Sequence, residues 1–169
     1  MRAQPKWRGR GINSPRPMSS PWGSSTRPCQ AIAIAGRSPE LKTRIEGVAK
    51  KVHYPLKVVG FTTEVPRFMA ASDLLVSKPG GLTSSEALAM GLPIMIVNPI
   101  PGQEANNTAY LTAMGAAIKL DFPQDINLVI DDLISKPEKL SCLRKAAVRI
   151  SKPNASMDTA KLLLNLYNA

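Results

Sequence analysis

The chain has 169 residues, of which 44% are apolar and 20% are charged. This length and composition predict one globular domain and exclude a wholly disordered, coiled-coil or collagen-like chain. Basic residues outnumber acidic ones by 22 to 12, but six basic and no acidic residues fall within residues 1–28. The net charge of +10 therefore does not require a basic face on the folded domain, and no specific nucleic-acid partner is expected.

Residues 1–28 differ in composition from the rest of the chain. They contain five Pro, three Gly and five Ser, with neither helical nor strand periodicity. Such a segment cannot bury enough apolar surface to offset its ordering entropy, so we predict a disordered basic arm. Trp7 and Trp22 are interleaved with basic residues, which leaves open a nucleic-acid-binding tail. A plain tail, or a non-native start to a truncated reading frame, is the favoured interpretation. The folded domain is then expected over residues 29–169.

From residue 30 onward, short apolar runs alternate with amphipathic segments. The runs predict strands over residues 30–35, 56–59, 74–77, 93–97 and 116–120. The segments predict helices over residues 38–52, 65–71, 84–90, 104–114, 126–135, 137–150 and 157–167. Strands that are apolar throughout and alternate with helices indicate an α/β fold with a parallel sheet covered on both faces. No apolar run approaches 18 residues, so no membrane span is predicted.

Two loops that follow predicted strands have an unusual composition. Ligands of doubly wound sheets bind at the carboxyl ends of the strands, where such loops meet helix N-termini. The first loop, residues 77–83, contains Gly80 and Gly81 and leads into a helix. Glycines permit close backbone approach, and the free N–H groups of a helix start suit a phosphate or diphosphate.

Glu86 follows this loop by one helical turn and has two possible roles. It could accept hydrogen bonds from the paired hydroxyls of a ribose, as acidic residues do in dinucleotide sites. The spacing Thr83-x-x-Glu86 also matches a capping box, in which Glu86 reaches back to the Thr83 amide. The spacing alone favours the cap over the ligand contact.

The second loop, residues 98–107, concentrates amide and carboxylate side chains around a helix start. Gln103, Glu104 and Asn107 supply the donors and acceptors that a polyhydroxylated ligand such as a hexose requires. The alternative is an ordinary helix start in which Glu104 favours the helix dipole. The pattern does not separate these two interpretations.

Cysteine usage indicates a reducing compartment. The chain has two cysteines, Cys29 and Cys142, with no C-x-x-C pair or His/Cys cluster. Neither a disulfide framework nor a metal site is expected, and we predict a cytoplasmic location. The single histidine, His53, has no nearby partner in the order of a catalytic triad and is interpreted as structural.

Four segments together resemble the family 28 glycosyltransferases, most closely the monogalactosyldiacylglycerol synthase and processive diacylglycerol glucosyltransferase branch. They are residues 60–65, residues 77–87 with the pattern KPGG-T-x-x-EA, residues 91–93 with GxP, and residues 101–107 with PGQE-x-x-N. The resemblance covers about residues 31–120 well and the helical end only in outline. It implies the C-terminal, Rossmann-like half of a GT-B fold, which binds a UDP-sugar donor as substrate and needs no further cofactor and no metal.

The resemblance also implies roles for individual residues. Gly80, Gly81 and Thr83 would approach the diphosphate, and Glu86 would bind the ribose. The second loop would contact the donor sugar, and residues 60–62 would lie against the uracil. The implied donor-binding residues are Gly60, Phe61, Thr62, Gly80, Gly81, Leu82, Thr83, Glu86, Gln103, Glu104 and Asn107. With the resemblance, the ligand role of Glu86 is favoured over the cap.

The chain departs from the family pattern at its beginning. Residues 1–28 stand where the resemblance implies an acceptor domain and a glycine-rich donor loop, so the catalytic base is not identified. The predicted function is donor binding in an inverting, metal-independent hexosyltransferase that uses UDP-glucose or UDP-galactose. Its lipid acceptor, of the diacylglycerol type, would bind through a missing domain or a partner subunit, and peripheral association with an anionic membrane would follow. The alternatives are the donor subunit of a two-component N-acetylglucosaminyltransferase and a non-catalytic α/β binding module.

Overall fold

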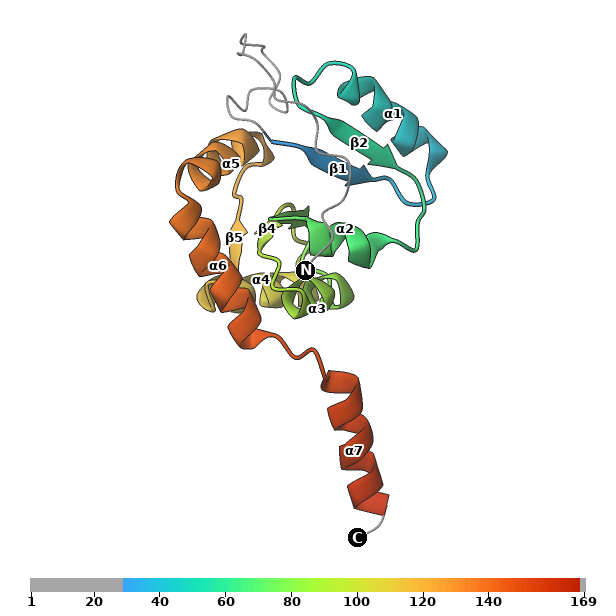
Figure 1. The fold of residues 1–169 in the computed structure, drawn as a ribbon, viewed down its shortest axis with the longest axis vertical. Helices are drawn as coiled ribbons and strands as arrows, with labels where there is room; N and C mark the ends of the chain where they lie inside the picture. The colour runs from blue at the N-terminus through green and yellow to red at the C-terminus, as the bar shows by residue number, and fades with distance from the viewer. Residues whose placement is uncertain (1–28, 168–169) are drawn as a thin grey trace, which may run out of the picture.

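The structure is a computed structural model that describes residues 29–167 (Figure 1). The predicted basic arm lies outside the described residues. The strands are β1 (Ala31–Ile34), β2 (Leu56–Val59), β3 (Leu75–Ser77), β4 (Ile94–Ile96) and β5 (Ala117–Lys119). The helices are α1 (Pro39–Ala49), α2 (Val65–Ala71), α3 (Gly81–Ala89), α4 (Gln103–Ala113), α5 (Ile126–Ser135), α6 (Pro137–Ile150) and α7 (Ala155–Tyr167). Every predicted strand and helix is present, with bounds shifted by a few residues.

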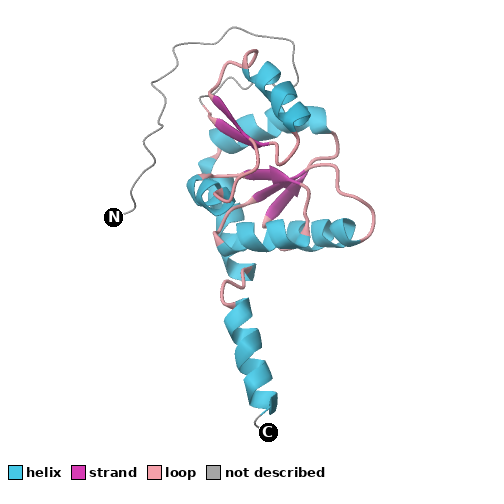
Figure 2. Ribbon diagram, turned by 90° about the vertical axis from the view of Figure 1, so that its right-hand side faces the viewer, coloured by secondary structure: helices cyan, strands magenta, loops and turns pink. Residues whose placement is uncertain are grey.

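All strand pairs among the described residues are parallel, as the apolar runs predict. The ladders form two sheets, one of β1 and β2 and one in the order β3-β4-β5. Figure 2 shows the strands in magenta as two separate groups, which correspond to these sheets. The Rossmann-like α/β fold is therefore confirmed. Among the described residues, however, no hydrogen-bonded ladder connects β1 to β3, so the strands form two sheets.

The core is built around β4, the central strand of the larger sheet. Its alternating side chains enter two clusters, because successive residues of a strand point to opposite faces. One face packs Met69, Ala87, Leu92, Ile94, Ile96, Leu111 and Ala117 from α2, α3, α4 and neighbouring strands. The other face packs Met95, Leu120, Ile126 and Leu133, the last two from α5. Helices thus cover both faces of this sheet.

Helix starts and turns follow local chemistry. The predicted N-cap of α1 is confirmed, since Ser38 accepts a hydrogen bond from the Leu41 N–H at 3.2 Å. After α3 the chain turns at Gly91, whose φ of +64° favours glycine. A Cβ at Gly91 would stand only 2.8 Å from Val148 Cγ2 of α6, so the missing side chain also allows close packing there.

Helix α7 extends away from the rest of the chain in both views (Figures 1 and 2). It contains no buried residue, and four of its leucines are exposed. Among the described residues, no helix is both long and apolar enough to cross a membrane.

Candidate functional site

The two loops of unusual composition lie side by side at one edge of the larger sheet. β3 leads into the first loop and β4 into the second, and these strands are hydrogen-bonded neighbours running in the same direction. The carboxyl ends of neighbouring parallel strands meet at one edge, so the N-termini of α3 and α4 meet there as well.

The first loop enters α3 earlier than the sequence predicts. The helix begins at Gly81, with Gly80 as an extended N-cap (φ −62°, ψ 146°) that supplies no side-chain hydrogen bond. The Ser84 N–H donates to the Gly80 carbonyl at 2.9 Å, so Thr83 lies inside the first turn. The predicted capping box of Thr83 and Glu86 is therefore wrong, because the helix starts upstream of it. The Glu86 side chain is exposed.

The second loop is shaped by Glu104 in the first turn of α4. Its Oε2 accepts a hydrogen bond from the Ile100 N–H at 2.7 Å, which holds the loop against the helix start. The N-cap of α4 is Gly102, whose φ of +99° favours glycine, and no side chain caps this helix either. Glu104 thus has a structural partner and also a position favoured by the helix dipole.

Two side chains of α4 reach the first loop. Asn107 Nδ2 donates a hydrogen bond to the Pro79 carbonyl at 2.8 Å, across 28 residues of sequence. Gln103 Nε2 lies 3.8 Å from the point where a Cβ on Gly81 would stand. The structure therefore brings Gly80, Gly81, Gln103 and Asn107 into one site at the meeting point of two helix N-termini.

Neither glycine of the first loop is required by its own backbone or packing. Gly80 and Gly81 do not have the positive φ that favours glycine. A Cβ on Gly80 would meet no atom within 4 Å, and one on Gly81 would make only an ordinary contact with Gln103. The space above these two residues is open to a ligand.

The remaining predicted residues lie at the carboxyl end of the smaller sheet. Gly60 follows β2, and a Cβ there would stand 3.8 Å from the Gly36 carbonyl oxygen in the loop after β1. The Arg37 guanidinium lies 4.6 Å from the centre of the exposed Phe61 ring, a cation–π contact. Thr62 Oγ1 accepts a hydrogen bond from the Glu64 N–H at 3.0 Å.

The two groups of predicted residues thus occupy corresponding edges of two sheets. Two contacts were not predicted from the sequence. Arg37 stacks on Phe61, and the Pro79 carbonyl accepts the hydrogen bond from Asn107. A basic residue after a strand is only a weak signal for the first, and nothing local in the sequence indicates the second.

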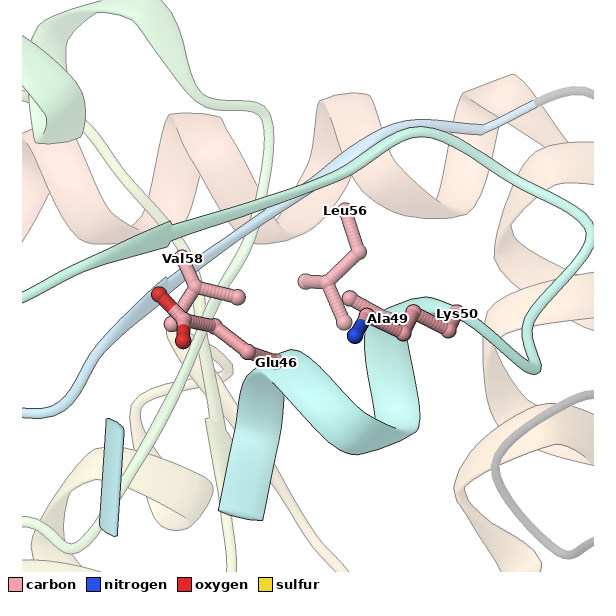
Figure 3. Close-up of a pocket in the computed structure, with 5 residues that line it drawn as sticks. All are labelled: Glu46, Ala49, Lys50, Leu56 and Val58. Atoms are coloured by element: carbon pink, nitrogen blue, oxygen red, sulfur yellow. The ribbon is translucent and has the colours of Figure 1, made fainter. Parts of the chain in front are cut away.

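Two hollows of the described chain lie away from these residues. One, of about 400 Å³, is lined by Glu46, Ala49, Lys50, Leu56 and Val58 between α1 and β2 (Figure 3). A second, of about 580 Å³, lies against α5 and α6. None of the predicted donor-binding residues lines either hollow.

Neither a cluster of metal-binding side chains nor His53 contributes to the candidate site in the described part of the chain. Residues 29–167 contain no group of three or more His, Cys, Asp and Glu side chains that could hold a metal ion. His53 is exposed and precedes β2, so it lies at the amino end of that strand, opposite the edge that carries the loops.

Comparison with protein families and curated proteins gives a consistent match. Residues 16–162 match the glycosyltransferase family 28 C-terminal domain. The chain is 32% identical over 137 residues to a processive diacylglycerol beta-glucosyltransferase of Staphylococcus epidermidis. It is 35% identical over 133 residues to monogalactosyldiacylglycerol synthase 3, chloroplastic, of Arabidopsis thaliana. These matches cover 81% and 78% of this chain but 35% and 28% of the relatives, so the chain spans about a third of their length.

Solved structures show the same fold at lower sequence identity. MurG of Acinetobacter baumannii matches with a TM-score of 0.56 and 18% identity, over 82% of this chain and 50% of that one. A UDP-GlcNAc 2-epimerase of Neisseria meningitidis, bound to UDP-GlcNAc, matches with a TM-score of 0.57 and 18% identity, over 83% of this chain and 45% of that one. About half of each of these chains corresponds to this domain, which fits one half of a GT-B fold.

Proposed function

The chain belongs to the glycosyltransferase family 28 C-terminal domain family, and from this we propose that it binds the UDP-sugar donor of a glycolipid-forming hexosyltransferase. The family membership supports a transferase, and the names of its relatives support a diacylglycerol-type lipid acceptor. The donor sugar is proposed to be glucose or galactose. The chain spans about a third of those relatives, so the activity of a whole enzyme is part of the proposal.

The observation that carries the proposal is the junction of the α3 and α4 N-termini. Neither helix has a side-chain cap, and Asn107 fastens one loop to the other through its hydrogen bond to Pro79. The first N–H groups of a helix have no partner within it and carry the positive end of the helix dipole. Two such ends at one edge, with exposed Lys78 beside them, suit a diphosphate.

The other predicted residues are assigned to the remaining parts of the donor. Gly80, Gly81, Leu82 and Thr83 form the turn over which the diphosphate would lie. Exposed Glu86 would accept hydrogen bonds from the ribose, and exposed Gln103 would contact the sugar, with Glu104 and Asn107 holding the loop in shape or joining the contact. Residues 60–62, with Phe61 stacked against Arg37, would lie against the uracil.

Transfer itself requires groups beyond the donor site. In an inverting, metal-independent reaction, an acceptor hydroxyl attacks the anomeric carbon from the face opposite to UDP while a base takes its proton. We propose that the acceptor and the base are supplied by a further domain or by a partner subunit, that no further cofactor takes part, and that the enzyme works at an anionic membrane surface. A two-component N-acetylglucosaminyltransferase would use the same donor half.

The decisive experiment is calorimetric titration of the folded chain with UDP, UDP-glucose and UDP-galactose. We expect saturable binding of UDP and at least one of the two sugar nucleotides, with inorganic pyrophosphate competing for the same site. A folded sample that binds none of these ligands at millimolar concentration would contradict the proposal. Tighter binding of UDP-N-acetylglucosamine than of either hexose nucleotide would instead favour the two-component enzyme.

A further inference from the structure

The Pro79 carbonyl is satisfied by a side chain from a distant part of the sequence. Pro79 is fully buried, so its carbonyl oxygen lies away from water. Asn107 of α4 donates to this oxygen from Nδ2 at 2.8 Å, and no backbone N–H of residues 29–167 donates to it. A buried carbonyl without a donor destabilises the folded state. The Asn107 amide therefore has a use in the chain before any ligand binds.

This hydrogen bond lies beyond the end of the ladder between β3 and β4. The ladder ends where the Val97 N–H donates to the Ser77 carbonyl at 3.2 Å. Past this point the two segments diverge, one into the loop before α3 and the other into the loop before α4. The bond from Asn107 to Pro79 joins them again and fixes the first loop relative to α4.

The bond also fixes the orientation of the peptide group that links Pro79 to Gly80. This peptide is trans, as are all peptides of the described chain. The C=O and N–H groups of a planar trans peptide point in opposite directions. With its carbonyl directed at Asn107, the peptide directs the Gly80 N–H away from the Asn107 amide. Within residues 29–167, that N–H donates to no backbone carbonyl.

Local sequence preference does not select this orientation. Proline fixes its own φ but not its ψ, and glycine accepts either sign of φ. Pro-Gly is also a pair favoured in type II turns, where glycine has a φ of about +80°. In the structure, the φ of Gly80 is −62°. Rotating the peptide to its other orientation would make this φ positive and turn the Gly80 N–H around.

A contact between distant segments therefore selects the backbone conformation just before α3. We propose that Asn107 is a positioning residue whose amide holds this peptide so that the Gly80 N–H is presented to the diphosphate of the ligand. The inference rests on the proposed function, which places a diphosphate over the first loop. It assigns Asn107 Nδ2 to the protein, whereas the resemblance implies a contact between Asn107 and the donor sugar.

The neighbouring residues of α4 support this division of roles. Glu104 Oε2 also has a partner within the chain, the Ile100 N–H at 2.7 Å. Gln103 is exposed, and its Nε2 lies 3.8 Å from the point where a Cβ on Gly81 would stand. Gln103 thus remains for contact with the sugar when Asn107 and Glu104 hold the two loops.

The test compares the same substitution at two adjacent residues of α4. Asn107→Asp keeps the shape of the side chain but replaces its donor with a second acceptor, which repels the Pro79 carbonyl. Asn106→Asp is the matched control, because Asn106 is exposed and the substitution adds the same charge one residue away. Calorimetry measures the binding of pyrophosphate, UDP, UDP-glucose and UDP-galactose to the parent chain and both variants. Urea denaturation shows whether each protein is folded.

Asn107→Asp is expected to weaken every ligand that the parent binds by about tenfold relative to Asn106→Asp, because the diphosphate common to them loses a donor. In the ligand-free chain, the NMR couplings between the amide proton and the α protons of Gly80 report its φ. They are expected to indicate a positive φ in Asn107→Asp but not in Asn106→Asp. Asn107→Ala removes the donor without adding a charge. It is expected to change both measurements in the same direction, and it replaces Asn107→Asp if that variant does not fold.

Three results would overturn the proposal. A loss confined to the sugar nucleotides, with unchanged affinity for pyrophosphate, would make Asn107 a sugar contact. An unchanged φ of Gly80 in the folded Asn107 variant would show that the amide does not hold the peptide. Equal losses in Asn106→Asp and Asn107→Asp would attribute the effect to charge alone. A parent chain that binds neither pyrophosphate nor UDP would instead contradict the proposed function, and the Gly80 couplings would still show whether Asn107 holds the peptide.

Discussion

At the scale of single residues, Gly80 and Gly81 do not serve the folded chain itself. Neither backbone has a positive φ; a Cβ on Gly80 would meet no atom within 4 Å, and one on Gly81 would make only an ordinary contact with Gln103. By contrast, Gly91 and Gly102 have a positive φ, so the turns there favour glycine. Neither a positive φ nor close packing therefore accounts for glycine at these two positions, which fits the proposed approach of a ligand to the backbone.

Gly81→Ala separates stability from binding. The substitution is expected to raise the free energy of unfolding by about 0.4–1 kcal/mol, since alanine restricts the unfolded chain and fits the helix start. It is expected to weaken binding of both UDP and pyrophosphate, because its methyl group occupies the open space above the loop. Gly47→Ala, in α1 with nothing within 4 Å of its Cβ position, is the control and should stabilise without affecting either ligand. Unchanged affinity in Gly81→Ala would remove this residue from the diphosphate site.

Glu86→Ala tests the ribose contact. Because α3 begins at Gly81, upstream of the capping-box position, and Glu86 is exposed, stability is expected to change by no more than about 0.5 kcal/mol. UDP binding should weaken by about 1.5–3 kcal/mol for each lost hydrogen bond to the carboxylate, while pyrophosphate binding should not change. Calorimetry with both ligands and chemical denaturation check this. A destabilised variant with normal UDP affinity would restore the structural role.

At the scale of elements, an ion pair connects α5 to α6, whereas α7 buries none of its side chains. Asp132 of α5 forms ion pairs of 2.6 Å with Lys136, at the end of α5, and with Lys139 of α6. The hydrogen bond from Lys136, followed by that from Lys139, holds the pKa of Asp132 below its ordinary value of 3.8. Helix α7 contributes no buried side chain to the described fold.

The ion pairs of Asp132 predict a pH dependence of stability. A carboxyl group with a depressed pKa in the folded state stabilises the fold above its unfolded pKa, and this contribution is lost as the pH falls through the folded pKa. The free energy of unfolding is therefore expected to fall below about pH 4, less steeply in Asp132→Asn than in the parent chain. Urea denaturation between pH 2 and 5 measures the difference. Parallel curves for the two proteins would show that these exposed pairs contribute nothing.

Leucine substitutions distinguish α4 from α7. Leu111 of α4 is 2% exposed, and Leu111→Ala is expected to cost about 2–5 kcal/mol through lost burial and the cavity left behind. Leu164 of α7 is 60% exposed, and Leu164→Ala is expected to change stability by no more than about 0.5 kcal/mol. Thermal or chemical unfolding checks both. A large effect of Leu164→Ala would mean that α7 packs against an apolar surface in solution.

At the scale of the whole molecule, the predicted donor-binding residues are divided between the two sheets. The predicted donor-binding residues lie at corresponding edges of two sheets that no described ladder joins. The chain spans about a third of the length of its curated relatives. Charge at this scale is divided, with six of the basic residues in the first 28 positions.

Much of the fold could be predicted from local pattern. Each apolar run became a strand, because a parallel strand is buried on both faces and so needs apolar residues throughout. The start of α3 was predicted too late, because two adjacent glycines indicate a loop although glycine is tolerated at an N-cap and the first helical position. The predicted capping box of Thr83 and Glu86 is wrong for the same reason, because it assumed that the helix begins at Thr83.

The sequence by itself determined the order of strands and helices, the family and the two loops of unusual composition, because these depend on neighbours along the chain. Only the tertiary structure decided that Asn107 holds Pro79, that Arg37 stacks on Phe61, and that the ladder is divided between β1 and β3. These features join residues far apart in sequence or depend on which strand lies beside which. Hydrogen bonds and packing between distant segments have no local signature, so they become visible only once the chain is folded.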